Sequence, residues 1–237
     1  MWSLLAGALT LATFLSGCTS GETEPAEDKE DLPAARRLIQ EGKLEEAHRL
    51  LKRLVQDEKR VAVRAVLSTE LATVLCLRAD AEPKSAKVFH NEAAGWARKA
   101  IADAPGLAAA QEALGTALLG LDRLDEAMVA LQEALAADAR RPAALRAMGL
   151  IEYRRRRYTE AIGRYRQARV YAPDDPRLVY NLAVALEARG RLEDLGEAKV
   201  LYRLYVRELG TGGAETGEAE KAIEAITRRL EAEKNRR

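Results

Sequence analysis

Cysteine and histidine, which serve as nucleophiles, general bases and zinc ligands, number only two each in this chain of 237 residues. The two cysteines are Cys18 and Cys76, and the two histidines are His48 and His90, which are too scattered for a zinc site or a disulfide framework. The sequence also lacks a glycine-rich phosphate loop, an HExxH pair and a nucleophile elbow. We therefore expect no catalytic residue, no metal site and no cofactor, and a protein that is not an enzyme.

The charged residues are numerous but balanced, with 38 Lys and Arg against 37 Asp and Glu and a formal net charge of +1. Because no overall positive field exists to neutralise phosphates, a nucleic-acid-binding protein is not expected. Acidic and basic residues alternate along helical segments, as they do on solvated helix faces. This distribution gives no reason to expect a small-molecule substrate.

Cys18 stands apart from the other cysteine because it ends an apolar run. Residues 2–15 carry no charge, and the run has the length of a signal-peptide hydrophobic region but not the roughly 20 residues needed to span a bilayer. The tetrapeptide at 15–18, Leu-Ser-Gly-Cys, resembles the bacterial lipobox, whose cysteine is diacylated before cleavage. The resemblance implies a lipoprotein signal peptide at 1–17 and lipidation of Cys18. The alternatives are an ordinary secretory signal with a coincidental cysteine, or a buried helix.

The segment after Cys18 predicts a tether. Residues 19–31 contain six acidic side chains and one Lys, with no periodic apolar positions. We therefore expect residues 18–31 to form a lipidated N-terminus and a disordered acidic tether. Because Thr19 rather than Asp follows the cysteine, the resemblance also implies sorting to the outer membrane of a Gram-negative cell, with the rest of the chain facing the periplasm.

The rest of the chain is dominated by a period of 34 residues, which is clearest when 108–141 is aligned with 142–175. The alignment pairs Leu114-Gly115 with Met148-Gly149, Leu124 with Tyr158, Glu126-Ala127 with Glu160-Ala161, Leu131 with Tyr165, and Ala134 with Ala168. The pattern resembles the tetratricopeptide repeat (TPR), which has a small residue at position 8, Ala at positions 20 and 27, and Leu or an aromatic residue at position 24.

The resemblance implies an all-α TPR helical solenoid over 32–237, built from about five helix-turn-helix repeats. The repeats are expected near residues 28–61, 62–107, 108–141, 142–175 and 176–212, followed by a C-terminal capping helix at 215–235. The composition agrees with this fold, because aromatic residues form only 5% of the chain while Ala, Leu, Arg and Glu recur throughout. Each repeat would bury the apolar stripes of two short amphipathic helices against its neighbours.

Small residues are expected where the two helices of a repeat approach each other most closely. These residues are Gly115, Gly149 and Ala183 on first helices, facing Ala127, Ala161 and Ala198 on second helices. Asp175 followed by Pro176 predicts a helix start with an N-cap and a proline in the first turn.

The second repeat departs from the period because 62–107 contains about twelve extra residues, which we place around 79–88. His90 is then expected in a loop just before the next helix. His48 is expected to be a surface or packing residue on the second helix of the first repeat. Cys76, within an apolar run, is expected to be a buried small hydrophobic residue.

A candidate binding face follows from the register. In the TPR family, positions 2, 5, 9, 12 and 13 of each first helix line the concave groove. The candidate partner-binding residues are Arg146, Leu150, Tyr153 and Arg154 in the fourth repeat, and Arg177, Tyr180 and Val184 in the fifth, together with Asn181 one residue beside these positions. Arg, Tyr and aliphatic side chains together are typical of interaction hot spots, and arginine forks suit carboxylates. The alternative is a solvated face that carries Tyr and Arg by chance.

The arginine run 154–157 ends the first helix of the fourth repeat, where cations suit the helix dipole, and Arg156 stands where the TPR family often has Gly. A solvated helix end is favoured over a contact with anionic lipid, because the run is not a long amphipathic basic helix. The carboxylate clamp of chaperone-binding TPR proteins is not reproduced, since Glu112, Thr116 and Ala147 occupy the relevant positions.

The predicted function is that of a lipid-anchored TPR adaptor, which binds a protein or peptide partner in the bacterial cell envelope and assembles or localises an envelope complex. Pilotin-type proteins and the TPR lipoprotein of outer-membrane assembly have a similar organisation. Two alternatives remain open: a homo-oligomeric structural scaffold, and a regulatory subunit of an envelope enzyme.

Overall fold

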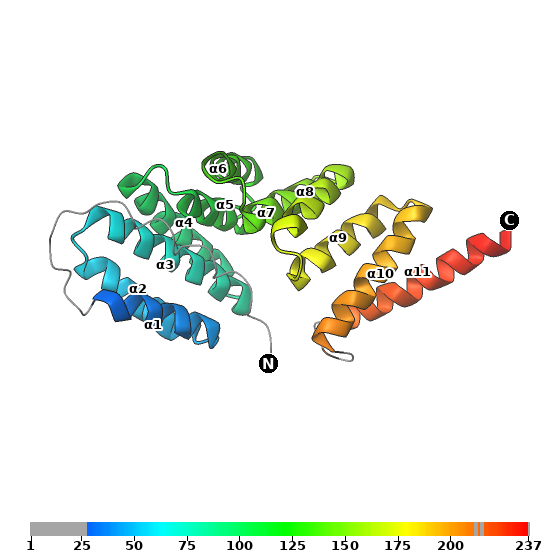
Figure 1. Ribbon diagram of the computed structural model, residues 1–237, viewed down its shortest axis with the longest axis horizontal. Coiled ribbons are helices and arrows are strands. Elements are labelled where there is room, and N and C mark those ends of the chain that lie inside the picture. Colours follow the sequence, from blue (N-terminus) through cyan, green and yellow to red (C-terminus); the bar gives the residue numbers. More distant parts are fainter. Residues whose placement is uncertain (1–27, 211–212, 214–215, 237) are drawn as a thin grey trace. The chain divides into compact units, whose positions relative to one another are not determined.

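The computed structural model describes residues 28–210, 213 and 216–236, and the predicted lipidation site Cys18 lies outside the described residues. Over this part of the chain the elements are eleven helices with no strand (Figure 1). In chain order they are α1 (Asp28–Gln40), α2 (Leu44–Asp57), α3 (Val61–Ala81), α4 (Ala86–Asp103), α5 (Ala108–Gly120), α6 (Leu124–Ala137), α7 (Pro142–Arg154), α8 (Tyr158–Tyr171), α9 (Pro176–Arg189), α10 (Leu192–Leu209) and α11 (Gly217–Arg236). The predicted all-α fold is confirmed.

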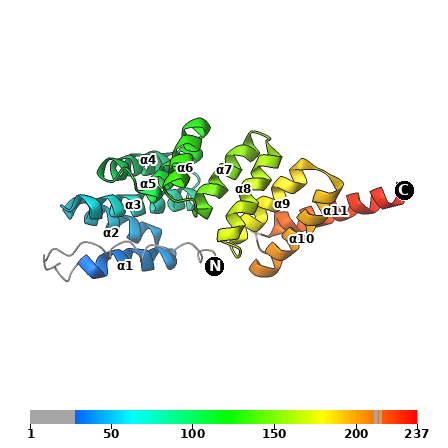
Figure 2. The ribbon, with the colours of Figure 1, turned by 45° about the horizontal axis from the view of Figure 1, so that its top comes forward.

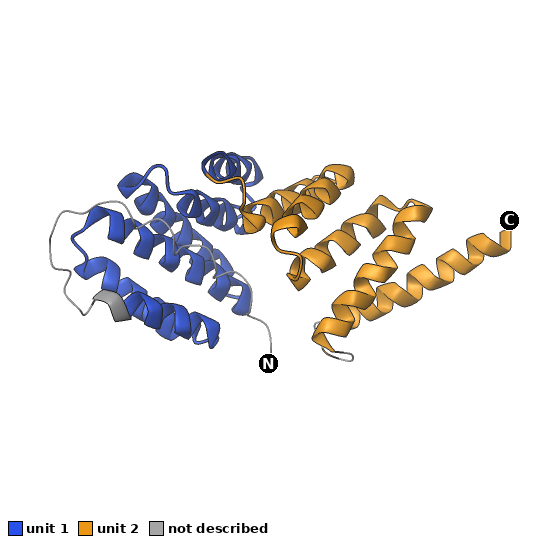
Figure 3. Ribbon diagram, viewed as in Figure 1, with its two compact units in different colours: residues 1–137 blue, residues 138–237 orange. Residues whose placement is uncertain are grey.

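The helices form two compact units, one containing α1 to α6 and the other α7 to α11 (Figure 3). Within each unit, every helix packs against the next in the chain, as α10 and α11 do in both ribbon views (Figure 1, Figure 2). The first helices of neighbouring repeats also contact each other. Helix α3 packs on α5 in one unit, and α7 packs on α9 in the other. This is the packing of helix-turn-helix repeats. None of the described helices is long and apolar enough to cross a membrane.

The turns between first and second helices share one backbone conformation. The residue at position 15 has a left-handed φ in four repeats: 74° at Gly42, 61° at Asp122, 59° at Arg156 and 75° at Gly190. Glycine adopts this conformation without strain, whereas a side chain with a Cβ does so at a cost. Arg156 therefore occupies the glycine position of the family, as the sequence predicted, and holds a strained conformation there.

The start of α9 also follows the sequence prediction. Asp175 is the N-cap, and its Oδ1 accepts a hydrogen bond from the backbone N–H of Arg177 at 3.0 Å. Pro176 follows at the first helical position, where its missing N–H leaves no donor unsatisfied.

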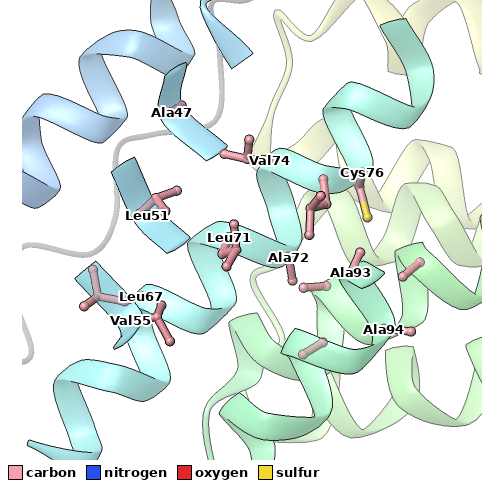
Figure 4. Close-up of a cluster of buried hydrophobic side chains, with 14 of the residues drawn as sticks. Ala47, Leu51, Val55, Leu67, Leu71, Ala72, Val74, Cys76, Ala93 and Ala94 are labelled. Carbon is pink, nitrogen blue, oxygen red and sulfur yellow. The ribbon is translucent and has the colours of Figure 1, made fainter. Parts of the chain in front are cut away.

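The core of the first unit is formed by apolar stripes of α2, α3 and α4. Figure 4 shows Leu51 of α2 facing Leu71 of α3, and Ala72 of α3 directed toward Ala93 of α4. Cys76 lies in the same cluster, and burial raises the pKa of its thiol to about 12. A thiol held neutral in this way is unreactive, in agreement with its expected role as a small hydrophobic residue.

The extra residues of the second repeat lengthen helices rather than forming an inserted loop. Helix α3 has 21 residues and α4 has 18, while both helices of the following repeat are shorter. The apolar stripe of α3 continues to the buried Ala79, which favours extension of the helix. The prediction that His90 lies in a loop is therefore wrong. His90 is a buried residue of α4, and its ring packs directly on Gly120.

The closest approach of α7 and α8 also differs from the sequence prediction. Gly149 faces the ring of Tyr165 rather than Ala161, because a Cβ added at Gly149 would lie 2.6 Å from Tyr165 Cε1. Gly115 faces both a large side chain and the backbone of the second helix. A Cβ added there would lie 2.6 Å from Leu131 Cγ and 3.2 Å from the carbonyl oxygen of Ala127. The small residue thus makes room for the large side chain at position 24, and not only for a second backbone.

Candidate partner-binding face

The sequence-predicted site residues all lie in the second unit, on α7 and α9. These two first helices contact each other, so residues 34 apart occupy equivalent places on them. Residues of both helices form one surface, which we call the α7–α9 face. It consists of Arg146, Leu150, Tyr153 and Arg154 of α7 together with Arg177, Tyr180, Asn181, Val184 and Glu187 of α9. Most of these side chains are half-buried, while Arg154 and Arg177 are exposed.

The register divides this face into three rows. Leu150 and Val184 occupy equivalent positions and form an aliphatic row at its middle. Arg146 and Tyr180 are equivalent one turn nearer the helix starts. At the other end, Tyr153 is equivalent to Glu187, which is not among the residues predicted from the sequence. The residues predicted for this face were mainly Arg, Tyr and aliphatic residues, and Glu187 was therefore not among them. Its position 12 in the repeat already indicated that it lies on this face.

Glu187 is held in place by the core of its own repeat. The Tyr202 hydroxyl donates a hydrogen bond to Glu187 Oε2 at 2.8 Å, and Tyr202 itself is buried between α9 and α10. Burial, the hydrogen bond to Glu187 and the charge of that carboxylate all raise the pKa of Tyr202. An ionised carboxylate can accept about four hydrogen bonds, so Glu187 keeps capacity for a further donor.

The arginines of the face are not equivalent binding groups. Arg177 folds back on the N-cap of its own helix, where Nε lies 3.0 Å from Asp175 Oδ1 and a terminal nitrogen lies 3.1 Å from Oδ2. The fork that was expected to suit a partner carboxylate is therefore occupied within the repeat. Arg146 and Arg154 of α7 both favour the charged form of Tyr165, but burial dominates and raises the pKa of that phenol.

The tyrosines of the face take part in packing as well. The Tyr180 ring lies 5.0 Å from the Tyr205 ring and 5.8 Å from the Tyr202 ring, centroid to centroid. Tyr153 lies 5.5 Å from Tyr158 in a tilted arrangement. Aromatic pairs at these separations are mutually stabilising. Tyr180 therefore contributes to the packing of α9 on α10 as well as to the face.

No group of three His, Cys, Asp or Glu side chains suited to a metal ion occurs among the described residues. His48 packs between helices of the first unit, with Nδ1 2.7 Å from an Arg78 guanidinium nitrogen. A cleft of about 400 Å³ in that unit is lined by Trp96, Lys99 and the Arg64–Asp103 ion pair. The Lys99 ammonium covers the Trp96 ring at 4.0 Å.

Comparison with known proteins identifies the fold. Residues 146–194, which include every residue of the α7–α9 face, match the model of the tetratricopeptide repeat family. No curated protein matches the sequence. Together with the eleven helices of the described residues and their repeated packing, this match defines an all-α TPR fold.

Several solved structures share this fold. TTC0263, a thermophilic TPR protein of Thermus thermophilus, is 19% identical and aligns over 83% of this chain and 98% of its own, with a TM-score of 0.66. PilF of Pseudomonas aeruginosa is 18% identical over 86% of this chain and 90% of its own, with a TM-score of 0.59. YrrB, described as a TPR protein with an unusual peptide-binding site, is 18% identical over 82% and 94%, with a TM-score of 0.50.

Proposed function

We propose that this protein is a lipid-anchored adaptor of the bacterial cell envelope that binds a protein or peptide partner through the α7–α9 face. By doing so it assembles or localises an envelope complex. The observation that carries this proposal is the composition of the face. Leu150, Val184, Tyr153 and Tyr180 remain only half-buried on two neighbouring first helices, where apolar and aromatic side chains have surface still to bury.

Two general arguments support this use of the face. Helical repeats present extended surfaces built from equivalent positions of successive repeats, and these surfaces are what repeat proteins use for binding. Tyrosine is enriched among residues that dominate binding energy, because it offers a large rigid surface with a polar tip. The similarity to YrrB, which has a peptide-binding site, agrees with a peptide partner.

Photo-crosslinking in cells that naturally produce the protein tests the face directly. A photoreactive phenylalanine analogue at Val184 is expected to yield a defined crosslinked partner. The matched control is the same analogue at Val170, a valine of α8 whose exposure is 75%. Adducts that are as abundant from Val170 as from Val184, or none from Val184, would place the binding surface elsewhere.

The lipid anchor is tested separately, because it rests on the tetrapeptide that ends in Cys18. Replacing Cys18 by Ser removes the thiol that accepts the lipid. The variant is expected to leave the membrane fraction while the wild-type protein stays in it. Equal membrane retention of the two proteins would contradict lipid anchoring at this residue.

A further inference from the structure

We propose that the Tyr153–Glu187 end of the α7–α9 face binds a cationic side chain, lysine or arginine, of the partner. The inference rests on the proposed function, and it reverses the expectation that the arginines of this face select a carboxylate. It is carried by three observations: the placement of a carboxylate beside aromatic rings, the fixed position of that carboxylate, and the engagement of Arg177 within its own repeat.

The first observation is the juxtaposition of aromatic rings and a carboxylate. Tyr153 and Glu187 occupy equivalent positions on two helices in contact, and the Tyr180 ring packs on Tyr202, which donates to Glu187. Tyrosine rings attract cations through the negative potential of their faces, and a carboxylate adds a charge-assisted hydrogen bond. A lysine or arginine stem would meanwhile lie on the aliphatic row of Leu150 and Val184.

The second observation is that the carboxylate is held in place before a ligand arrives. The 2.8 Å hydrogen bond from the buried Tyr202 restrains Glu187, so less side-chain entropy is lost when a cation binds. Negative charge is also felt by the neighbouring phenols. The pKa values of Tyr153 and Tyr180 are raised, first by burial and then by charged neighbours that include Glu187, with Glu218 of α11 contributing at Tyr180.

The third observation concerns the charges of the α7–α9 face. Arg177 is bound by both oxygens of Asp175, which neutralises the guanidinium within its own repeat. Glu218 is exposed and forms an ion pair with Lys221 at 2.8 Å. Arg154 follows Tyr153 on α7 and is exposed, so one basic side chain of the face lies at this end. Next to Glu187, a partner cation would still meet a carboxylate and tyrosine rings, whereas a partner carboxylate would meet Glu187.

Fluorine NMR of the full-length protein in detergent micelles tests this inference. All seven tyrosines lie between Tyr153 and Tyr205, so uniform 3-fluorotyrosine labelling reports on the second unit alone. The probes are Nα-acetyl-lysine amide, its uncharged analogue Nα-acetyl-norleucine amide, and the anionic Nα-acetyl-glutamate amide. We expect the lysine probe to shift the Tyr153 and Tyr202 resonances saturably, and the other two probes to bind at least about tenfold more weakly.

Two variants give the measurement its controls. Glu187→Gln keeps an acceptor for the Tyr202 hydroxyl but removes the charge, and it should weaken the lysine probe about tenfold. Glu160→Gln, at an exposed carboxylate of α8, should leave its affinity unchanged. The inference is overturned if norleucine or glutamate binds as well as lysine. It is also overturned if Glu187→Gln has no effect, or if lysine gives no saturable shift up to about 50 mM.

The outcomes also separate this inference from the proposed function. If Val184 captures a partner but the lysine probe fails, the face binds a partner without selecting a cation. If the lysine probe binds but Val184 captures nothing, the cation site stands and the adaptor role fails.

Discussion

The contact between Gly149 and Tyr165 allows a stability measurement whose sign depends on the register of the repeat. A Cβ added at Gly149 would lie 2.6, 2.8 and 3.0 Å from three carbons of the Tyr165 ring. The ring is only 1% exposed, so it has no solvent-facing space into which to move. Replacing Gly149 by Ala must therefore push α7 and α8 apart or displace the ring.

The expected magnitude follows from two opposing terms. Overpacking a filled core destabilises by about 1–3 kcal/mol, whereas Ala is favoured over Gly in a helix by about 1 kcal/mol. We expect Gly149→Ala to lower the free energy of unfolding by about 1 kcal/mol, which lowers the Tm by about 2–4 °C in a chain of this size. The helix-propensity term can be measured alone at Gly163 of α8, where an added Cβ would meet nothing within 4 Å.

Thermal unfolding followed by circular dichroism compares the two variants. Gly163→Ala is expected to raise the Tm by about 2–4 °C, because it gains helix propensity without a clash. Gly149→Ala is expected to shift the Tm in the opposite direction. If both variants raise the Tm equally, Gly149 does not face the Tyr165 ring, and the reasoning from the repeat register is refuted.

Two further stability predictions come from other parts of the fold. Arg156→Gly should stabilise the protein by about 0.5–1 kcal/mol in urea unfolding, because Arg156 holds a left-handed φ of 59°, and no gain would contradict strain at this turn. Burial lowers the pKa of His48, so its neutral form stabilises the fold above its ordinary pKa of 6.5, and this contribution is lost as the pH falls below that value. The variant His48→Gln can still accept a hydrogen bond from Arg78 but does not titrate. Between about pH 7 and pH 5, the Tm of this variant should fall less than the Tm of the wild-type protein. Equal falls in Tm would exclude His48 as the titrating group.

The sequence predicted the features that depend on local spacing. The 34-residue period, the helix start at Asp175–Pro176 and the turn position of Arg156 follow from residue types at fixed offsets, and the structure contains the last two at the predicted positions. The composition likewise sufficed for the all-α fold. These features are set within a few residues of the chain, where helix-capping and turn preferences act.

The features that the sequence did not predict depend on side-chain conformation, or on which of several possible partners a charged side chain binds. Arg177 was expected to face a partner, but Asp175 lies two residues away and binds it first. Gly149 was paired with a small residue, although the space next to it is filled by the long ring of Tyr165. Position 12 of the repeat places Glu187 on the face, but the hydrogen bond from Tyr202 that restrains its carboxylate depends on side-chain conformation.

The affinity of the partner for face variants tests the central claim most directly. With the partner captured through Val184, calorimetry on Tyr153→Ala should show a loss of at least about 2 kcal/mol, near thirtyfold in Kd, if Tyr153 is a central contact. The control is Tyr171→Ala, at a tyrosine of α8 that is 41% exposed and outside the α7–α9 face, for which we expect a change below about 0.5 kcal/mol. Circular dichroism melts of both variants establish that each remains folded. An unchanged Kd for folded Tyr153→Ala, or equal losses for the two variants, would contradict binding through the α7–α9 face.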